Sequence, residues 1–377
     1  MIATRMKKRV LIGVMTALAL PLFGQNEVQF IRIVSPTNSR IIQFSPDGSL
    51  VWSNGALGIT CIVQRASSIS GPSNWVDYAQ KVVITTNRVV TATLRDLSVP
   101  ADVKLIPAGT FSMGDTRDNT SGEAPVHSGD VSGFYMGKTE VTKDQWDVVY
   151  NWAIEHGYTF DGFLTGKATN HPVQRVSWYD CVKWCNARSE KEGRTPCYTV
   201  NGDVYRTDQI DPECSWSADG YRLPTEAEWE KAARGGLSSK RFPWGDTIQH
   251  TKANYYSSSS LSSYDTSSTR SYHPTYSNNT SSPYTSPAGS FPTNSYGLYD
   301  LAGNVSEWCW DWYDGSYYAS SPSSDPRGPS WGSYRVRRGG DYQSYADFSR
   351  VASRIVNAFP YDSRSTVGFR IALSAGP

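Results

Sequence analysis

The chain has no excess of charge of either sign. Its 377 residues contain 36 Lys and Arg against 35 Asp and Glu, so the formal net charge is +1. Proteins that attract nucleic acid or anionic membranes over long range do so with an excess of basic residues. We therefore expect no nucleic-acid partner and a surface made polar by uncharged side chains.

The sequence also lacks a membrane span at its N-terminus. The apolar segment Val10–Leu20 is shorter than the roughly 20 residues that a membrane helix needs. It follows a basic stretch at residues 5–9, and the small residue Gly24 lies at a plausible cleavage point. This order predicts a signal peptide over residues 1–24; the alternative is a buried N-terminal strand or helix. We expect an exported protein, whether periplasmic, cell-surface or extracellular, with no stable membrane insertion.

Histidine is rare, and no group of Cys and His has the spacing of a zinc site. Export would permit disulfides among the six cysteines. Cys197 and Cys214 flank a short hairpin-like insertion and are the favoured pair. Either of two cysteines on a predicted helix could bond to Cys309. The pairing stays open for Cys61, Cys181, Cys185 and Cys309.

Two domains follow the predicted signal peptide. Residues 25–100 contain short apolar or alternating runs separated by turn sequences such as Pro46-Asp-Gly, which predicts a small β-sandwich-like domain. Residues 104–374 have an α+β pattern with much irregular coil. Capping boxes at Thr142 and Thr225 predict the starts of two helices, and a third is expected from Ser177 to Ser189. Residues 255–290, rich in Ser, Tyr and Thr, predict long surface-packed loops.

Three strings in the second domain carry a family resemblance. They are Gly-Tyr-Arg-Leu-Pro-Thr-Glu-Ala-Glu-Trp from Gly220, Gly-Leu-Tyr-Asp-Leu-Ala-Gly-Asn-Val from Gly297, and the C-terminal segment from Arg335-Val-Arg-Arg-Gly-Gly to Val367-Gly-Phe-Arg. Together they resemble the sulfatase-modifying-factor family. The resemblance implies the formylglycine-generating-enzyme fold, a variant of the C-type lectin fold, over residues 104–374.

The same resemblance bears on catalysis. Oxidases of the family hold copper(I) with two cysteines, four and nine residues after the Gly-Gly pair. Counted from Gly340, these positions are Ser344 and Ser349. Alcohols neither ionise near neutral pH nor match the softness of copper(I). We therefore expect no copper site, although a formylglycine-generating oxidase or related oxidoreductase remains the alternative function.

A calcium site is also implied by the resemblance. Its ligands would be Asp300, the carbonyls of Gly303 and Val305, and Glu307, which are the hard oxygen ligands that Ca²⁺ prefers. The alternative is a hydrogen-bonded turn without an ion. A second site would use Asn254 and the carbonyl of Tyr255. Its acidic partner would fall near residues 279–280, where no Asp is present.

The C-terminal segment interleaves scaffold-like and variable-looking positions. In this it resembles the variable proteins of diversity-generating retroelements; the alternative is an ordinary family member with drifted loops. We expect Tyr345, Phe348, Phe359 and Tyr361 to lie exposed on one face beside the two serines, and Arg350, Arg354 and Arg364 to point inward. The function predicted is a non-catalytic, calcium-stabilised ligand-binding or display module for an unknown protein or glycan. A purely structural cell-surface component is a further alternative.

Overall fold

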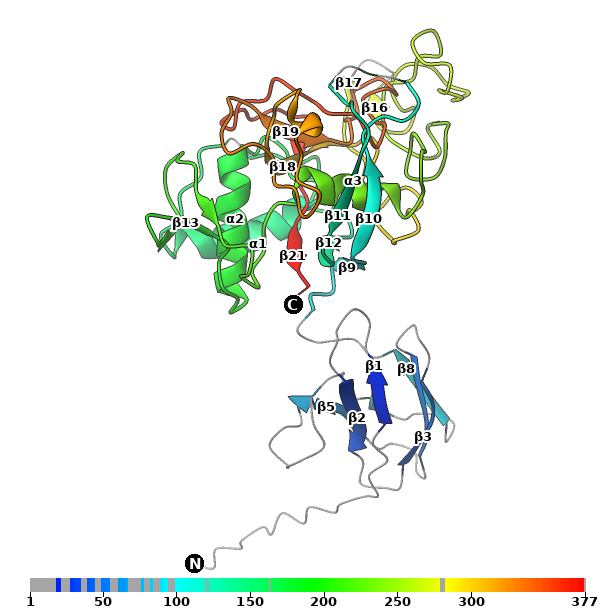
Figure 1. Cartoon of the computed structure of the whole chain (residues 1–377), viewed down its shortest axis with the longest axis vertical. Coiled ribbons are helices and arrows are strands. Elements are labelled where there is room, and N and C mark those ends of the chain that lie inside the picture. The colour runs from blue at the N-terminus through cyan, green and yellow to red at the C-terminus, as the bar shows by residue number, and fades with distance from the viewer. Residues whose placement is uncertain are drawn as a thin grey trace, which may run out of the picture. The chain divides into compact units, whose positions relative to one another are not determined.

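The computed structural model describes residues 99–375 apart from 119, 121, 163 and 279–281 and, within the first 98 residues, the backbone of the strands. The chain divides into two compact units that meet between Ala101 and Asp102 (Figure 1). In the part of the chain that the structure describes, no helix is long and apolar enough to cross a membrane.

The first unit contains two antiparallel sheets. One has the order β1-β2-β5-β6, with β7 also paired to β5, and the other has the order β3-β4-β8. The strands are β1 (Leu18–Pro21), β2 (Val28–Val34), β3 (Ser39–Phe44), β4 (Ser49–Asn54), β5 (Thr60–Ala66), β6 (Val76–Asp77), β7 (Val82–Val83) and β8 (Val89–Thr93). In the uncleaved chain β1 falls within the predicted signal peptide. Cleavage after Gly24 would remove β1 and leave β2 paired with β5.

In the second unit, one sheet joins the start of the unit to its end. Strand β12 (Phe134–Gly137) lies between β9 (Val103–Ile106) and β21 (Ala372–Ser374), and both pairings are antiparallel. Figure 1 shows the C-terminal strand beside these early strands. Strand β10 (Gly109–Met113) forms a separate hairpin-like pair with β11 (His127–Val131). These pairings hold the last strand of the unit, β21, in the same sheet as its first strands, β9 and β12.

Three helices begin at capping boxes. Helix α1 (Lys143–Ile154) starts after Thr142, α2 (Trp178–Lys191) after Ser177 and α3 (Glu226–Arg234) after Thr225. In each case the cap hydroxyl accepts a backbone N–H three residues on, and that residue's side chain accepts from the cap's own N–H. The predicted starts of the helices are confirmed. Helix α3 ends at Gly235, whose φ of 56° suits glycine.

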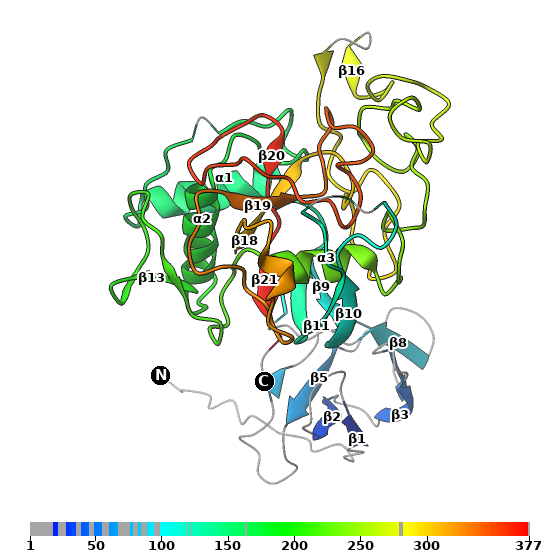
Figure 2. The ribbon, with the colours of Figure 1, turned by 45° about the horizontal axis from the view of Figure 1, so that its top comes forward.

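A three-stranded sheet holds both ends of the segment 341–365, which connects two of its strands. Strand β18 (Ser306–Trp312) lies between β19 (Arg335–Arg338) and β20 (Val367–Gly368). Figure 2 shows this sheet with α1 and α2 to one side and α3 with β10 and β11 to the other. The remaining elements are short: β13 (Tyr198–Val200), β14 (Asp203–Val204), β15 (Glu213–Cys214), β16 (Ser277–Asn278), β17 (Ser282–Pro283) and the 3-10 helix η2 (Tyr317–Ala319). Much of the unit is packed coil, as predicted.

The core of the second unit is rich in tryptophan and in buried charge. Five tryptophans are fully buried: Trp146, Trp178, Trp184, Trp229 and Trp308. Three arginines are equally buried: Arg335, Arg338 and Arg370. Because an unpaired buried charge is costly, these arginines demand partners inside the fold. Their partners determine how the candidate site is built.

Candidate functional site

Residues 341–365 form an irregular segment between β19 and β20. It begins after Gly339 and Gly340, which have φ of 92° and 72°. A Cβ at Gly340 would lie 2.7 Å from Ser349 Oγ, so this close approach requires glycine. Successive turns follow, in which Ser344 N–H donates to Asp341 O and Phe348 N–H donates to Tyr345 O. The segment is therefore held by local turns rather than by a helix or strand.

The two serines at the thiol positions have different surroundings. Ser349 is fully buried, and its Oγ has no hydrogen-bond partner among the described residues. Ser344 is half-buried, and its carbonyl accepts from Tyr256 N–H at 2.9 Å. In the described part of the chain, the histidine hydrogen bonds go to other partners, and the Ser344 side chain is hydrogen-bonded to the carboxylate of Asp341.

The four aromatic residues expected at the surface are exposed, which confirms that part of the prediction. Tyr345, Phe348, Phe359 and Tyr361 are 38%, 42%, 36% and 54% exposed. Ring contacts join them into two clusters. Tyr345 packs edge-on against Tyr256 at 5.1 Å, while Phe359 stacks on Tyr361 at 5.1 Å. Their role in binding a ligand stays a prediction.

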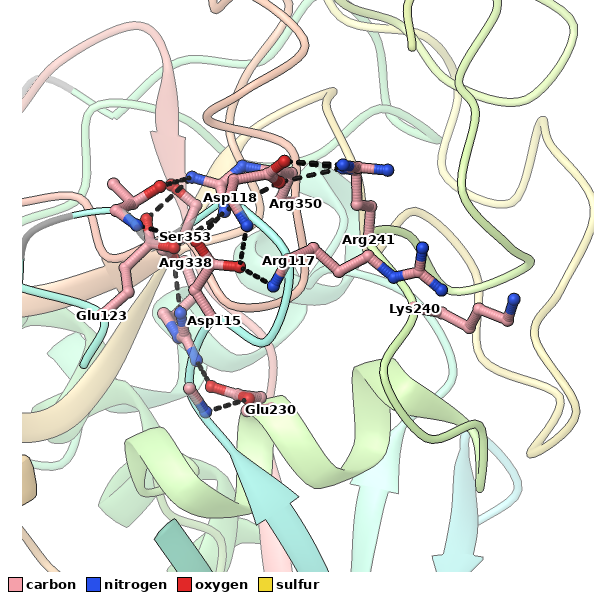
Figure 3. Close-up of polar contacts among 12 residues, drawn as sticks. Asp115, Arg117, Asp118, Glu123, Glu230, Lys240, Arg241, Arg338, Arg350 and Ser353 are labelled. Atoms are coloured by element: carbon pink, nitrogen blue, oxygen red, sulfur yellow. Dashed lines mark hydrogen bonds and ion pairs between the residues drawn. The ribbon is translucent and has the colours of Figure 1, made fainter. Parts of the chain in front are cut away.

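Arg350 points inward from the same segment. Its guanidinium makes a bidentate pair with Glu123 at 2.8 and 2.9 Å, and Asp115 and Asp118 lie 3.5 and 3.7 Å away. Figure 3 shows Arg350 surrounded by these acids, with Arg241 reaching Asp118 from the other side. The planar fork of arginine matches a carboxylate. This bidentate pair therefore fixes the position of the loop as well as neutralising the charge of Arg350.

Arg354 is held in the same way. It is 7% exposed, and it pairs with both oxygens of Glu226, at the start of α3, at 2.7 and 2.9 Å. Arg338 of β19 lies beside it and pairs with Glu230 (Figure 3). The expectation for Arg364 is wrong: its side chain is 54% exposed and pairs at the surface with Asp362. Arg364 follows Asp362 in a surface turn, so no buried acid is within its reach.

Asp300 lies in a tight loop before β18. It has a φ of 54° and is 6% exposed. Its Oδ2 accepts Gly289 N–H at 2.6 Å, but its Oδ1 is buried with no partner in the described chain. Burial raises the pKa of Asp300 to about 6. A Cβ at Gly303 would lie 2.2 Å from the carbonyl oxygen of Asn254, so the loop needs glycine there.

Glu307 does not join Asp300 as the resemblance implies. Arg370 donates to both of its carboxylate oxygens at 2.5 Å, and Trp229 Nε1 donates to one of them at 2.7 Å. A carboxylate already saturated by a guanidinium is a poor ligand for a second cation. The structure thus gives Glu307 a guanidinium partner, and its role as a calcium ligand stays a prediction.

Glu140 was missed by the sequence analysis, yet it lies in this cluster. It is fully buried, its Oε1 accepts Asn304 Nδ2 at 3.0 Å, and its Oε2 has no partner among the described residues. Burial, followed by the charges of Asp300 and Glu307, raises the pKa of Glu140 well above its usual value. The sequence around it, Lys138-Thr-Glu-Val, gives no sign that this acid is buried. Three carboxylates here, those of Glu140, Asp300 and Glu307, act on the single guanidinium of Arg370.

Asp300 and Glu140 each have a buried carboxylate oxygen with no partner among the described residues, whereas both oxygens of Glu307 accept from Arg370. In the described chain no three Asp, Glu, His or Cys side chains are arranged to hold a metal, so carbonyl and amide oxygens would complete such a site. Those of Gly303 and Val305 remain candidates. At the second expected site Asn254 Oδ1 is buried with no partner among the described residues, while His250 Nε2 lies 3.1 Å from the Tyr255 carbonyl, so this site stays a prediction. Residues 279–280 lie outside the described chain.

The predicted Cys197–Cys214 disulfide is not formed in the structure, where both residues are free thiols. Tyr198 pairs with Cys214 across β13 and β15, and Ser215 N–H donates to the Cys197 carbonyl. Adjacent positions in a strand point to opposite faces, so this register directs the two sulfurs apart. Cys181, Cys185 and Cys309 are buried free thiols as well, and Cys61 lies outside the residues whose side chains are described.

Comparison with known proteins gives a consistent family. Residues 90–375 match the family model described as the sulfatase-modifying factor enzyme 1-like domain. The chain is 34% identical over 286 residues to the formylglycine-generating enzyme of Mus musculus, covering 71% of this chain and 73% of that protein. It is 32% identical over 271 residues to the chaperone protein LppX of Paenibacillus barcinonensis, covering 69% and 85%.

Among solved structures, the chain resembles Treponema denticola variable protein 1. The TM-score is 0.57 and the sequence identity 31%, with 72% of this chain and 94% of that one covered. This likeness extends over the second unit's fold, the formylglycine-generating-enzyme variant of the C-type lectin fold.

Proposed function

This chain belongs to the sulfatase-modifying factor enzyme 1-like family, and we propose that within it the protein is an exported, non-catalytic ligand-binding module. One observation supports this most directly. In residues 341–365, exposed aromatic side chains alternate with arginines that are buried in ion pairs. Such a segment can present recognition residues on a rigid base, because aromatic anchors contribute much of the free energy of binding.

The ligand we propose is a protein or a glycan. Tyr345, Phe348, Phe359 and Tyr361 offer apolar rings, and the chain has a net charge of only +1, which does not suit nucleic acid. The similar Treponema denticola protein is named a variable protein, which agrees with a segment built to present changeable residues. Export from the cell would bring such a surface to external ligands.

A direct test uses protein and glycan arrays. Wild type should bind a defined set of spots, and a variant with all four aromatics changed to alanine should lose them. The matched control changes three other exposed apolar residues, Val148, Ile154 and Leu261, to alanine. If both variants bind like wild type, this segment is not the binding surface.

The competing function is formylglycine generation, the activity for which the mouse relative is named. Ser344 and Ser349 lack the thiolates that copper(I) prefers. We expect no conversion of cysteine to formylglycine when the protein is incubated with a sulfatase-type peptide, copper and oxygen. Mass spectrometry that detects turnover above a metal-free control would establish the enzyme instead.

Calcium would stabilise the module at the Asp300 loop. We propose Asp300 and Glu140 as its carboxylate ligands, with the carbonyls of Gly303 and Val305. An ion that binds only the folded state adds about 3 kcal/mol when its free concentration is 100 times its Kd. Thermal unfolding with calcium or EDTA measures this effect.

Two variants separate the ligand sets. Glu140→Gln should abolish the response to calcium while leaving the EDTA-treated protein folded. Glu307→Gln should lower stability equally with and without calcium, because it leaves Arg370 without its partner. A calcium response that is lost in Glu307→Gln and kept in Glu140→Gln would restore the original ligand set.

A further inference from the structure

Strand β19 carries three buried arginines, and one of them lacks an acidic partner. Arg335 pairs with Asp211, and Arg338 pairs with Glu230. Arg337 is 5% exposed, yet among the described residues no Asp or Glu forms an ion pair with it within 4.0 Å. Its charge is therefore the least compensated of the three.

The hydrogen bonds of Arg337 are equally sparse. Its side chain makes one long bond, from Nη1 to Ser306 Oγ at 3.4 Å, and its Nε has no partner in the described chain. A guanidinium has five N–H donors in a fixed fork. The face of Trp308, 5.6 Å away, offers only a weak attraction. Burying a cation with most of its donors unused is unfavourable unless something else satisfies them.

A second arginine stands beside it and increases the imbalance. The charge of Arg364 adds to burial in lowering the pKa of Arg337 to about 10. Arg364 itself is exposed and pairs with Asp362 at 3.0 Å, and Asp362 also accepts the N–H of Phe359. Arg337 is thus connected, through this surface turn, to the exposed pair Phe359 and Tyr361.

We propose that Arg337, with Ser306 and Arg364, forms a binding site for a carboxylate group of the ligand. The guanidinium fork matches a carboxylate, and Ser306 Oγ lies within reach as a neutral partner. Arg364 lies in the same surface turn as the Phe359–Tyr361 pair, so a ligand whose carboxylate reaches Arg364 can also contact these aromatics. This inference names a chemistry for the ligand of the proposed binding module, and in that sense it rests on the proposed function.

Two acids, Asp341 and Asp362, act on Arg337 through their charge but form no ion pair with it among the described residues. Asp362 is already paired with Arg364, and burial raises the pKa of Asp341. The fork of Arg337 is therefore left for an added carboxylate, which would bind through directed hydrogen bonds as well as through charge.

The test measures anion binding by the full chain without needing the natural ligand. Thermal unfolding is followed in sodium acetate, sodium phosphate and sodium chloride at equal ionic strength. We expect acetate to raise the midpoint of wild type above that in chloride by about 2–4 °C more than it raises the midpoint of Arg337→Met. Phosphate measures the general stabilisation by excluded salts, which does not depend on Arg337. Equal responses to acetate in the two proteins would overturn the proposal.

Variants on one strand provide the controls. Arg337→Met should remove the response to acetate and, in chloride, should be at least as stable as wild type, because it removes an uncompensated buried charge. Arg335→Met, which breaks a pair with Asp211, should lower the midpoint and keep the response to acetate. A response that persists in Arg337→Met would place the anion elsewhere.

Arg364→Ser tests the other arginine of the proposed site, at an exposed position where the substitution does not threaten folding. It should reduce the response to acetate without lowering the midpoint in chloride. An unchanged response would exclude Arg364 from the site. Because the acetate test does not involve the aromatics, its failure would leave the array test of the binding module intact. Failure of the arrays would in turn leave a measured anion site without an assigned ligand.

Discussion

The outer and inner sides of residues 341–365 have opposite chemistry and opposite tolerance to change. The outer side presents Tyr345, Phe348, Phe359 and Tyr361, which are at least one-third exposed. The inner side anchors Arg350 and Arg354 to acids far away in the sequence. Stability should therefore depend on the arginines and recognition on the aromatics. We therefore expect substitutions of the outer aromatics to leave the shape of the segment unchanged.

The sharpest way to break this comparison is Arg354→Met. The change removes the bidentate partner of buried Glu226 and leaves it only Arg338 Nε at 3.6 Å, so we expect a loss of about 3 kcal/mol in the free energy of unfolding. Urea denaturation measures it. Arg364→Met is the matched control at an exposed pair, with an expected loss below about 1 kcal/mol. Similar losses in both variants would mean that the inner side is not the structural one.

A second prediction tests the layer beneath the outer aromatics. His250 is buried against Tyr255, and burial, followed by the charge of His273, lowers its pKa to about 4. The unfolded chain, with a histidine pKa near 6.5, binds more protons between these values. Stability should therefore fall as the pH drops from about 6.5 to about 4, by about 3 kcal/mol from this group.

Comparison with His250→Gln isolates that contribution, because the carboxylates titrate alike in both proteins. The variant should lose less stability than wild type between these two pH values. His156→Gln, at an exposed histidine, should behave like wild type. If His250→Gln and wild type lose stability in parallel, the buried layer does not depend on a neutral His250.

The smallest expected effect is on the outer side itself. Tyr361 is 54% exposed, so Tyr361→Ser should change the free energy of unfolding by no more than about 0.5 kcal/mol. Tyr255→Phe, inside the fold, should cost about 1–3 kcal/mol, because it removes the hydroxyl that donates to buried Asp265. The same denaturation curves measure both, and a loss for Tyr361→Ser as large as that for Tyr255→Phe would contradict the division into two sides.

Much of the second unit could be predicted because its signals are local. The capping boxes at Thr142 and Thr225 depend on residues three apart, and the structure has both. The strings around Gly220 and Gly297 identify the fold for the same reason. Exposure of the four aromatics followed from their alternation with scaffold-like positions. These features need only the chain's own neighbours in sequence.

The partners of buried charges could not be predicted. Glu307 pairs with Arg370, 63 residues away, and the ligand-like oxygen beside Asp300 comes from Glu140, 160 residues before it. The Cys197–Cys214 bridge failed for a related reason, since strand register sets the direction of each sulfur. Arg364 was assigned inward by its resemblance to its neighbours, but it has no buried acid within reach.

By itself, then, the sequence determined the family and the helix starts, because each is a property of residue identity at fixed spacing, while the placing of Ser344 and Ser349 at the thiol positions stays a prediction. Only the tertiary structure decided which charges are satisfied: Arg350, Arg354 and Arg338 find acids, Glu307 is occupied by an arginine, and Arg337 is left without an acidic partner among the described residues. The physical reason is that desolvation makes a buried charge depend on atoms within a few ångströms, and those atoms come from distant parts of the chain.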